Sequence, residues 1–450
     1  MLPAGFAEKI EQLPDFDARG FLRSLEGPAL RGLRVNTLKC APEEFARRVE
    51  GEGFGLSPVP FAPEGFYLRG ACSGRHPWHH AGLFYLQEPS AMSAVTALDV
   101  RPGHRVLDLC AAPGGKSTQA AAKLAGKGLL FSNEVVRART AALLSNLERF
   151  GVRNAVVLSE TPERLCARLP EYFNRVLVDA PCSGEGMFRR DETAVREWTP
   201  AGSLACARRQ SGILEAAAGA VAPGGILVYS TCTFSPEENE GVAAAFLRAH
   251  PEFHAESIPA SFGRPARPDF ADAPEELALA RRVFPEDGGE GHFVVRLRRA
   301  GEEPASAPEQ VKAPAGGVPQ FRAFWEENFS GEIPGASEER GGRVFLLPEG
   351  LPDLRGLAVL RTGVPAGELR GGRFVPDHAL FLAAGNAARS RLDLPLSDAR
   401  LAAFLHGEQI EAPGCVKGWA CVCAEGFPVG FGKVSEGVLK NHYPKGLRNL

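Results

Sequence analysis

Short apolar runs alternate with amphipathic stretches between about residues 100 and 300, and this alternation is the clearest pattern in the chain. Six runs have the length and composition of strands: 104–110, 128–134, 155–160, 174–180, 225–230 and 292–298. Helical periodicity separates most of them, from about 117 onward and over about 137–150, 162–169, 202–221 and 236–249. Short apolar strands that alternate with helices predict an α/β fold, with a doubly wound parallel sheet covered on both faces.

The pattern changes on both sides of this stretch, which divides the chain into four parts. Residues 1–95 predict a small α+β lobe, helical to about residue 27; the resemblance described below implies that this lobe binds RNA. Residues 96–300 carry the sheet and the catalytic chemistry. Residues 301–318 are rich in Pro, Ala and Gly and predict a linker. Residues 319–450 alternate short strand patterns with Gly and Pro turns, which predicts a β-rich C-terminal region.

Composition and charge indicate the kind of protein and its location in the cell, but they say little about its chemistry. At 450 residues the chain is long enough for two to four domains, and 44% hydrophobic with 23% charged residues is ordinary for a globular protein. The net charge of −3 means that any nucleic-acid surface must be local. The first residues lack the features of a signal peptide, and no apolar run approaches a membrane span. We therefore expect a cytoplasmic protein without a membrane partner, and a monomer is the simplest expectation.

Metal chemistry is not indicated. The ten cysteines are scattered without a Cys-x-x-Cys pair, and in a reducing compartment they are most simply free thiols. The histidine-rich run 75–80 has no acidic or thiol residues beside it, so a loop with hydrogen-bonded histidines is the better interpretation. We expect no metal.

Polar motifs follow five of the predicted strands directly. They begin at Asp108, Glu134, Ser159, Asp179 and Thr231. Ligands of open parallel sheets bind beyond the carboxyl ends of the strands, so these motifs predict one site.

The turn over residues 108–117 resembles a cofactor loop but fits neither the dinucleotide fingerprint nor a phosphate-binding loop. Gly114 and Gly115 permit close approach of the backbone, and Pro113 stiffens the bend. A cofactor without phosphates fits such a turn, and S-adenosylmethionine is the obvious candidate. Glu134 ends the next strand, where a carboxylate can accept hydrogen bonds from ribose hydroxyls.

Two cysteines stand at strand ends fifty positions apart. Cys182 lies in a glycine-containing loop, and Cys232 precedes Ser235 and Pro236, which together signal the start of a helix. A helix N-terminus there would favour the Cys232 thiolate. Thiolates add to electron-poor carbons, so two thiols beside a cofactor turn predict covalent activation of a substrate followed by group transfer.

Three segments at this site resemble the Nop/Sun family of RNA cytosine-C5 methyltransferases. They are Cys-Ala-Ala-Pro-Gly-Gly-Lys at 110–116, Asp-Ala-Pro-Cys-Ser-Gly-Glu-Gly at 179–186 and Ser-Thr-Cys-Thr at 230–233. Residues 34–39, 87–91 and 289–293 are similar to supporting motifs of that family. The C-terminal part resembles the bacterial F-type branch, which acts on small-subunit ribosomal RNA, and its last domain is similar to PUA-like RNA-binding modules.

The resemblance implies a Rossmann-like methyltransferase sheet and assigns roles to particular residues. The Cys232 thiolate would add to C6 of cytosine, Asp179 would pair with N3, and Cys182 would resolve the adduct. Lys116 would lie between cofactor and base. The residues implied in binding S-adenosylmethionine are Cys110, Ala111, Ala112, Pro113, Gly114, Gly115, Lys116, Glu134, Glu160 and Asp179. Many relatives have an Asp near the adenine where this chain has Ser159-Glu160-Thr161, and Glu160 takes that place here.

Ribosomal RNA within the small subunit is the implied partner. Candidate RNA contacts are Arg31, Arg34, Lys39, Arg189, Arg190, Lys440, Lys445 and Arg448. Three alternatives stay open: a reversed assignment in which Pro181-Cys182 supplies the nucleophile, a C5-methyltransferase of tRNA, and a ribosome-assembly factor with a vestigial cofactor site.

Overall fold

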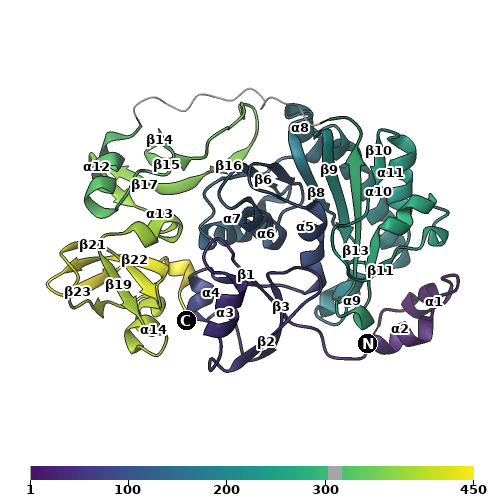
Figure 1. Ribbon diagram of the computed structural model, residues 1–450, viewed down its shortest axis with the longest axis horizontal. Coiled ribbons are helices and arrows are strands. Elements are labelled where there is room, and N and C mark those ends of the chain that lie inside the picture. The colour runs from purple at the N-terminus through teal and green to yellow at the C-terminus, as the bar shows by residue number, and fades with distance from the viewer. Residues whose placement is uncertain (1, 303–316, 450) are drawn as a thin grey trace.

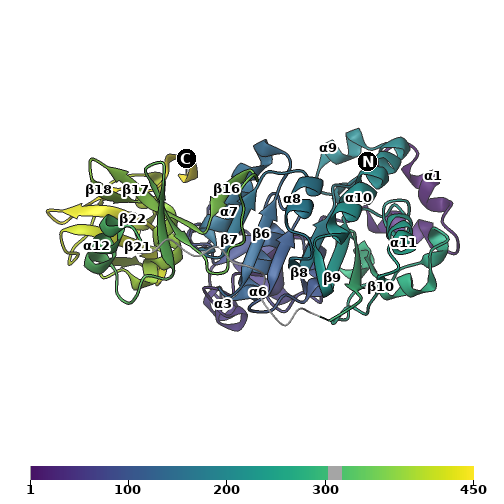
Figure 2. The same ribbon diagram turned by 90° about the horizontal axis from the view of Figure 1, so that it is seen from above.

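The computed structural model describes residues 2–302 and 317–449, so most of the predicted linker, 303–316, lies outside the described residues. The described residues form four sheets in an elongated molecule (Figures 1 and 2). The largest sheet occupies the middle, the N-terminal lobe lies against it, and two small sheets from the C-terminal part form one end.

The central sheet confirms the predicted α/β class. Its parallel strands follow the order β7 (Ala155–Leu158), β6 (Leu129–Asn133), β5 (Arg105–Asp108), β8 (Phe173–Asp179) and β9 (Val221–Thr231). β13 (His292–Arg299) pairs antiparallel with β9. The chain is wound in opposite directions on the two sides of the β5–β8 pair, and ligands of such sheets bind at this reversal.

Further short strands extend both edges of this sheet. Beyond β13 lie β12 (Arg281–Val283), β11 (Arg264–Pro265) and β10 (Phe253–Ala255). Beyond β7 lies β16 (Val359–Thr362), which comes from the C-terminal part of the chain. Sequence patterning did not predict this last strand.

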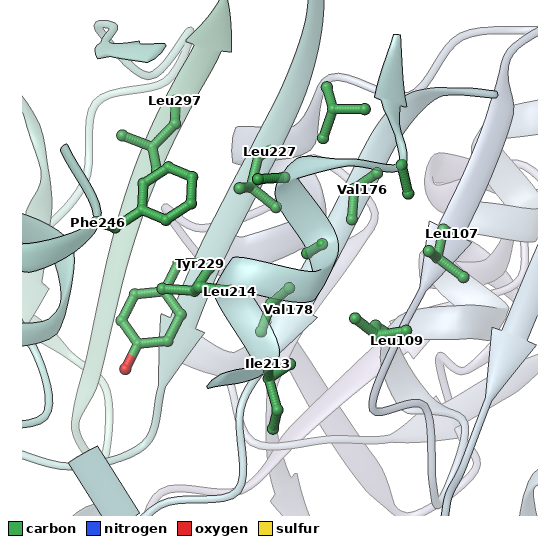
Figure 3. Packing of buried hydrophobic residues seen from close by; sticks show 14 of the residues in the cluster. Leu107, Leu109, Val176, Val178, Ile213, Leu214, Leu227, Tyr229, Phe246 and Leu297 are labelled. Atoms are coloured by element: carbon green, nitrogen blue, oxygen red, sulfur yellow. The ribbon is translucent and has the colours of Figure 1, made fainter. Parts of the chain in front are cut away.

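Helices cover both faces because the strands are apolar on both. α5 (Ser93–Leu98), α6 (Gly115–Leu124) and α7 (Thr140–Arg149) pack on one face. α8 (Pro162–Arg168), α10 (Pro200–Ala218) and α11 (Glu240–Ala249) pack on the other. On that second face, side chains of α10 and α11 pack on side chains of β8, β9 and β13 (Figure 3). Figure 3 labels Ile213, Leu214 and Phe246 from the two helices, and Val176, Val178, Leu227, Tyr229 and Leu297 from the three strands.

The predicted helix start at Ser235 is wrong. α11 begins at Glu240, and residues 236–239 form turns. The Ser235 hydroxyl donates to Glu237 (2.7 Å). The Asn239 side chain accepts a hydrogen bond from the Thr231 hydroxyl (2.6 Å) and donates one to the Thr233 carbonyl (2.9 Å). Side-chain bonds of this kind compete with the helix. Cys232 therefore does not lie at a helix N-terminus, and the dipole argument for its thiolate does not apply.

The N-terminal lobe combines short helices with a sheet in the order β2-β3-β1-β4. Its helices are α1 (Phe6–Glu11), α2 (Ala18–Ser24), α3 (Pro42–Arg48) and α4 (Pro77–His80). Its strands are β1 (Gly32–Val35), β2 (Phe54–Pro58), β3 (Gly65–Gly70) and β4 (Phe84–Leu86). The α+β character predicted for this lobe is confirmed.

The C-terminal part contains two antiparallel-rich sheets. The first joins β14 (Ala336–Arg340), β15 (Arg343–Leu347), β17 (Val364–Arg370) and β18 (Arg373–Pro376), with α12 (Pro319–Asn328) and α13 (His378–Ala384). The second joins β19 (Arg391–Leu394), β21 (Gly418–Ala424), β22 (Phe427–Ser435), β23 (Val438–Asn441) and β20 (Ile410–Glu411), with α14 (Ala399–His406). Across the described ranges, no helix combines the length and apolar character that a bilayer crossing requires.

Arg34 joins the N-terminal lobe to the cofactor turn and is not available to RNA. Its side chain is fully buried and donates to Gln87 (2.9 Å), to the Gly115 carbonyl (2.8 Å) and to Thr118 (2.8 Å). Burial lowers the pKa of Arg34 to about 10, so the side chain stays protonated at neutral pH. The expectation of an RNA contact at this position is corrected to a structural role.

We expect Arg34→Ala to lower the free energy of unfolding by about 2–4 kcal/mol, because it removes a fully buried side chain that donates three hydrogen bonds, two of them to buried side chains, Gln87 and Thr118. Urea unfolding measures the change. Arg31→Ala is the matched control, since the exposed Arg31 side chain bonds only to the carbonyls of Gly70 and Cys72, and we expect a loss below about 1 kcal/mol. Equal stability of the two variants would contradict the structural role of Arg34.

Candidate active site

The two cysteines that follow strands β8 and β9 meet. Their sulfur atoms lie 3.2 Å apart, and the backbone N–H of Cys232 lies 3.4 Å from the Cys182 sulfur. The pairing of the strands causes this contact: Asp179 lies opposite Ser230 in the parallel register, so the two loops leave the sheet at the same level. Both thiols are partly exposed, as a site for a substrate requires.

Cys182 holds its proton firmly. A hydrogen bond with Cys232, followed by burial, raises the pKa of Cys182 well above its ordinary value of 9.0. Cys182 is therefore a thiol at neutral pH and can donate to the neighbouring sulfur.

An ion pair stands beside the thiols. Lys116 Nζ lies 2.7 Å from Asp179 Oδ2, and the Ser230 hydroxyl donates to Asp179 Oδ1 (2.8 Å). Burial is the largest influence and would raise the pKa of Asp179, but the Lys116 charge, the neighbouring His292 and the hydrogen bonds from Lys116 and Ser230 together outweigh it, so the pKa falls below its ordinary value. Asp179 is ionised at neutral pH and presents a fixed carboxylate beside the thiols.

The predicted cofactor turn follows β5 and starts α6. Gly114 has φ +109°, a conformation that other residues rarely adopt, and the Ala112–Pro113 peptide is cis. Asp108, beneath the turn, accepts a hydrogen bond from Ser117 (2.7 Å), and burial raises the pKa of Asp108 to about 7. Burial also raises the pKa of Cys110, which is an inert thiol in the wall of the turn.

Glu134 occupies the end of β6, as predicted. Its carboxylate accepts the Val136 N–H (2.9 Å) and lies 3.3 Å from Arg139, which also donates to the Ala112 carbonyl (3.0 Å). Val135 and Val136 are 55% and 47% exposed, unusually open for valine. An acid flanked by open apolar side chains is suited to a ligand with a polar sugar and an apolar ring.

Glu160 lies at the end of β7, but its carboxylate turns towards the C-terminal part of the chain. Oε1 accepts the Ala358 N–H (2.6 Å), and Oε2 lies 3.2 Å from Arg164. The side chain is only 4% exposed. The adenine contact assigned to Glu160 stays a prediction.

Several residues that hold the site together were missed by sequence reasoning. Asn133 donates to the carbonyls of Leu109 (3.2 Å) and Glu160 (3.0 Å) and accepts the Glu160 N–H (3.0 Å), which joins three strand ends. Glu185 accepts from the Trp198 indole (2.9 Å) and the Phe234 N–H (2.9 Å). Its position inside the 179–186 motif was the available signal.

Glu238 and Gln210 join the two cysteine loops through hydrogen bonds. Glu238 accepts the Ser183 N–H (2.9 Å) and the Gln210 amide (2.9 Å), while Gln210 also donates to the Pro181 carbonyl (3.1 Å). The hydroxyls of Ser183 and Thr233 bond directly to each other (2.8 Å). The short separation of the thiols is therefore held by a buried polar network.

His292 is a further neighbour that sequence reasoning left without a role. It is 3% exposed, and among the described residues neither ring nitrogen has a hydrogen-bond partner of standard geometry. β13 pairs with β9 so that Phe293 lies opposite Thr231, which places His292 at the level of Cys232. Burial, followed by the nearby Lys116 charge, lowers the pKa of His292 to about 4; Asp179, Glu88 and the Gly291 backbone act weakly against this.

The candidate RNA contacts fall into two groups. Arg189 pairs with Glu290 (2.7 Å), and Lys39 donates to the carbonyls of Ala81 (2.6 Å) and Arg149 (3.0 Å), so both have structural partners. The exposed candidates without an ion pair among the described residues are Arg31, Arg190, Lys440 and Lys445, while Arg448 is half-buried. Only this second group offers charge to a ligand.

His76 and His80, from the histidine-rich run, have ordinary hydrogen-bond partners. His76 caps α4 by accepting the Trp78 N–H (3.2 Å), and His80 bonds to Tyr443 (2.7 Å) and Asn449 (3.0 Å). The residues with described placement include no cluster of three His, Cys, Asp or Glu suited to a metal ion.

The strand order, the glycine turn after the first strand and the acid after the second define a Rossmann-like methyltransferase with a PUA-like C-terminal domain. The sequence model described as 16S rRNA methyltransferase RsmB/F matches residues 95–298. Models for the N-terminal, first C-terminal and PUA domains of RsmF match 2–89, 323–383 and 391–449. The chain belongs to the 16S rRNA methyltransferase RsmB/F family.

Relatives support this assignment over nearly the full length. The chain is similar to ribosomal RNA small subunit methyltransferase F of Vibrio parahaemolyticus (34% identity, 99% of this chain and 97% of the relative) and of an Enterobacter species (33%, 98% and 94%). A methyltransferase homologue from Pyrococcus horikoshii is similar in structure, with 34% identity and a TM-score of 0.58 over 65% of this chain and 94% of that one. The NSun6 structure from the same organism shares the fold (22% identity, TM-score 0.59, 67% and 99%).

We expect His292→Phe to raise the free energy of unfolding by about 1 kcal/mol at neutral pH, because it removes two buried nitrogens that lack partners. The gain should grow in acid. The folded-state pKa of about 4 lies below the ordinary 6.5, so unfolding takes up a proton between these values and the native protein loses stability as pH falls.

Thermal unfolding of both proteins between pH 7 and pH 4.5 measures this gain. His254→Phe, at an exposed histidine of β10, is the control and should change stability by less than about 0.5 kcal/mol. A His292→Phe protein whose stability falls with acid as steeply as the wild type would contradict the expectation.

Proposed function

We propose that this protein transfers a methyl group from S-adenosylmethionine to C5 of a cytosine in small-subunit ribosomal RNA, through a covalent bond between Cys232 and C6. The observation that carries the proposal is the pair of thiols 3.2 Å apart at the carboxyl edge of the sheet, next to the Lys116–Asp179 ion pair. A group-transfer site without a covalent step has no need of a second thiol in contact with the first.

The carboxyl edge fits S-adenosylmethionine. The Gly114 turn allows the backbone to approach a ligand, and Glu134 ends the second strand, where ribose hydroxyls find an acceptor. Val135 and Val136 offer apolar surface beside that acid for an adenine ring. When bound, S-adenosylmethionine supplies an electrophilic methyl group. The residues that hold it are those of the 110–116 turn with Glu134.

The protein's own groups then divide the work on the base. The Cys232 sulfur bonds to C6, and the electron pair of the C5–C6 bond becomes available at C5. As Cys232 adds, N3 takes up a proton from solvent, and the Asp179 carboxylate accepts a hydrogen bond from this N3–H; the proton is given up again when the C6–S bond breaks. The adjoining Lys116 ammonium offsets the negative charge that moves into the ring during the addition. After C5 has gained the methyl group, its proton leaves to solvent and the C6–S bond breaks. Cys182, which keeps its proton, donates to the departing Cys232 sulfur.

The RNA substrate follows from the family and from the flanking domains. The relatives are named for the small-subunit ribosomal RNA, and the chain matches them from end to end. The target base must leave its stack to reach the thiols. Arg190, Lys440 and Lys445 are the exposed cations that we propose for backbone contacts. We propose that the protein acts as a monomer in the cytoplasm.

RNA that contains 5-fluorocytosine separates the two thiols. Fluorine cannot leave C5 as a proton does, so the adduct persists and appears as a shifted band on a denaturing gel. We expect wild type and Cys182→Ala to form the adduct and Cys232→Ala to form none. With ordinary RNA, Cys182→Ala should accumulate adduct, while Cys232→Ala should lose more than about 10³-fold in methyl transfer.

Cys206→Ala is the matched control, because this thiol lies on α10 outside the site and its loss should change neither readout. An adduct formed by Cys232→Ala but not by Cys182→Ala would reverse the two assignments. Bisulfite mapping of ribosomal RNA with and without the gene identifies the target. An unchanged set of 5-methylcytosines there would overturn the ribosomal substrate.

A further inference from the structure

A segment of the C-terminal part, residues 350–363, crosses onto the catalytic sheet and is called the strap here. It leaves the first C-terminal sheet after β15 and returns to it in β17. Between these strands it forms β16, which pairs antiparallel with β7, Val359 opposite Leu158 and Thr362 opposite Val156. Figure 2 shows β16 beside β7 and α7.

Three kinds of contact hold the strap against the catalytic domain. Leu351, Leu354 and Leu357 pack against the core of the catalytic domain. Arg361 is 4% exposed and donates to the Val152 carbonyl (2.9 Å). Arg168 pairs with Asp353 (2.8 Å) across the two domains. Apolar packing, a buried cation and an ion pair together make this a specific intramolecular interface.

Gly363 lets the chain leave the interface. Its φ is +62°, and a Cβ at this position would lie 1.9 Å from the Leu346 carbonyl oxygen. Its N–H donates to the Ala155 carbonyl (2.8 Å), the first residue of β7. The turn from β16 into β17 therefore depends on a glycine, and the strap ends at this residue.

Glu160 is where the strap meets the cofactor edge. Its Oε1 accepts the Ala358 N–H (2.6 Å), while the neighbouring Ser159 N–H donates to the Ala358 carbonyl (3.0 Å). On the other side, the backbone of Glu160 is held by the Asn133 side chain, and the Asn133 carbonyl accepts the Ala111 N–H (2.8 Å) of the cofactor turn. A continuous chain of hydrogen bonds joins the strap to that turn.

We propose that Glu160 is a positioning residue that fixes the strap as one wall of the cofactor site, so that cofactor affinity depends on a segment of the C-terminal part. The inference rests on the proposed function in that it takes S-adenosylmethionine as the ligand. A carboxylate whose two oxygens are occupied by Ala358 and Arg164, and whose side chain is 4% exposed, acts through these partners.

A double-mutant cycle on the full-length protein tests this, with S-adenosylhomocysteine as the calorimetric ligand. Ala358→Pro removes the N–H that Glu160 accepts and keeps the carbonyl that Ser159 uses; the edge of a sheet tolerates proline. Glu160→Ala removes the acceptor. We expect each variant to weaken binding about 10-fold and the double variant to be no weaker than either, because both remove one interaction.

Two further variants sharpen the result. Glu160→Gln keeps an oxygen for Ala358 and should bind within about 3-fold of wild type. Arg370→Ala is the matched control: its side chain is 69% exposed and pairs with Glu368 on its own strand, β17, outside the strap, so its loss should leave binding unchanged. If Ala358→Pro fails to fold by thermal unfolding, Leu357→Ala, which removes apolar packing of the strap and leaves the Glu160 carboxylate unchanged, is measured alone and should still weaken binding.

Independent effects, with the double variant about 100-fold weaker, would show that Glu160 contacts the cofactor directly and overturn the inference. So would unchanged affinity in the strap variant. If the wild-type protein binds no S-adenosylhomocysteine, the proposed function is overturned instead. Failure of the inference and failure of the proposed function therefore give different results.

Discussion

The register between β8 and β9 governs the site more than any single side chain. Because Asp179 lies opposite Ser230 in a parallel pair, the loops after both strands start at one level and their thiols meet at 3.2 Å. The same pairing lets Ser230 bond to Asp179 and lets Lys116, from the neighbouring helix, reach the same carboxylate. A shift of one residue in this register would separate the sulfur atoms and break both contacts to Asp179.

Buried side chains that do not take part in the reaction stabilise that register. Glu185 and Glu238 are buried carboxylates that accept hydrogen bonds from backbone N–H groups of the opposite loop, so each ties one cysteine segment to the other. Buried polar networks are stable only when every member is bonded, which makes them strict about geometry. The cost appears at buried polar atoms that have no partner of standard geometry among the described residues: Glu238 Oε1 within the network and both ring nitrogens of His292 beside the ion pair.

The sequence predicted the strands and their polar ends well, because apolar runs of strand length are a local property of the chain. It failed where side chains compete or where distant segments pair. The helix signal at Ser235 was overridden by Asn239 and Glu238, which turn into the loop network. Arg34 looked like surface charge because its acceptors, Gly115 and Thr118, are eighty positions away. The pairing of β16 with β7 left no local pattern at all.

The strap also sets a constraint on biosynthesis. β7 is the last parallel strand on its side of the sheet, and the strand that covers its free edge is encoded roughly 200 residues later. At about 5–20 residues per second, translation leaves that edge open for about 10–40 seconds. Uncovered strand edges pair readily with other chains, so this interval is when the nascent protein is most exposed to misassembly.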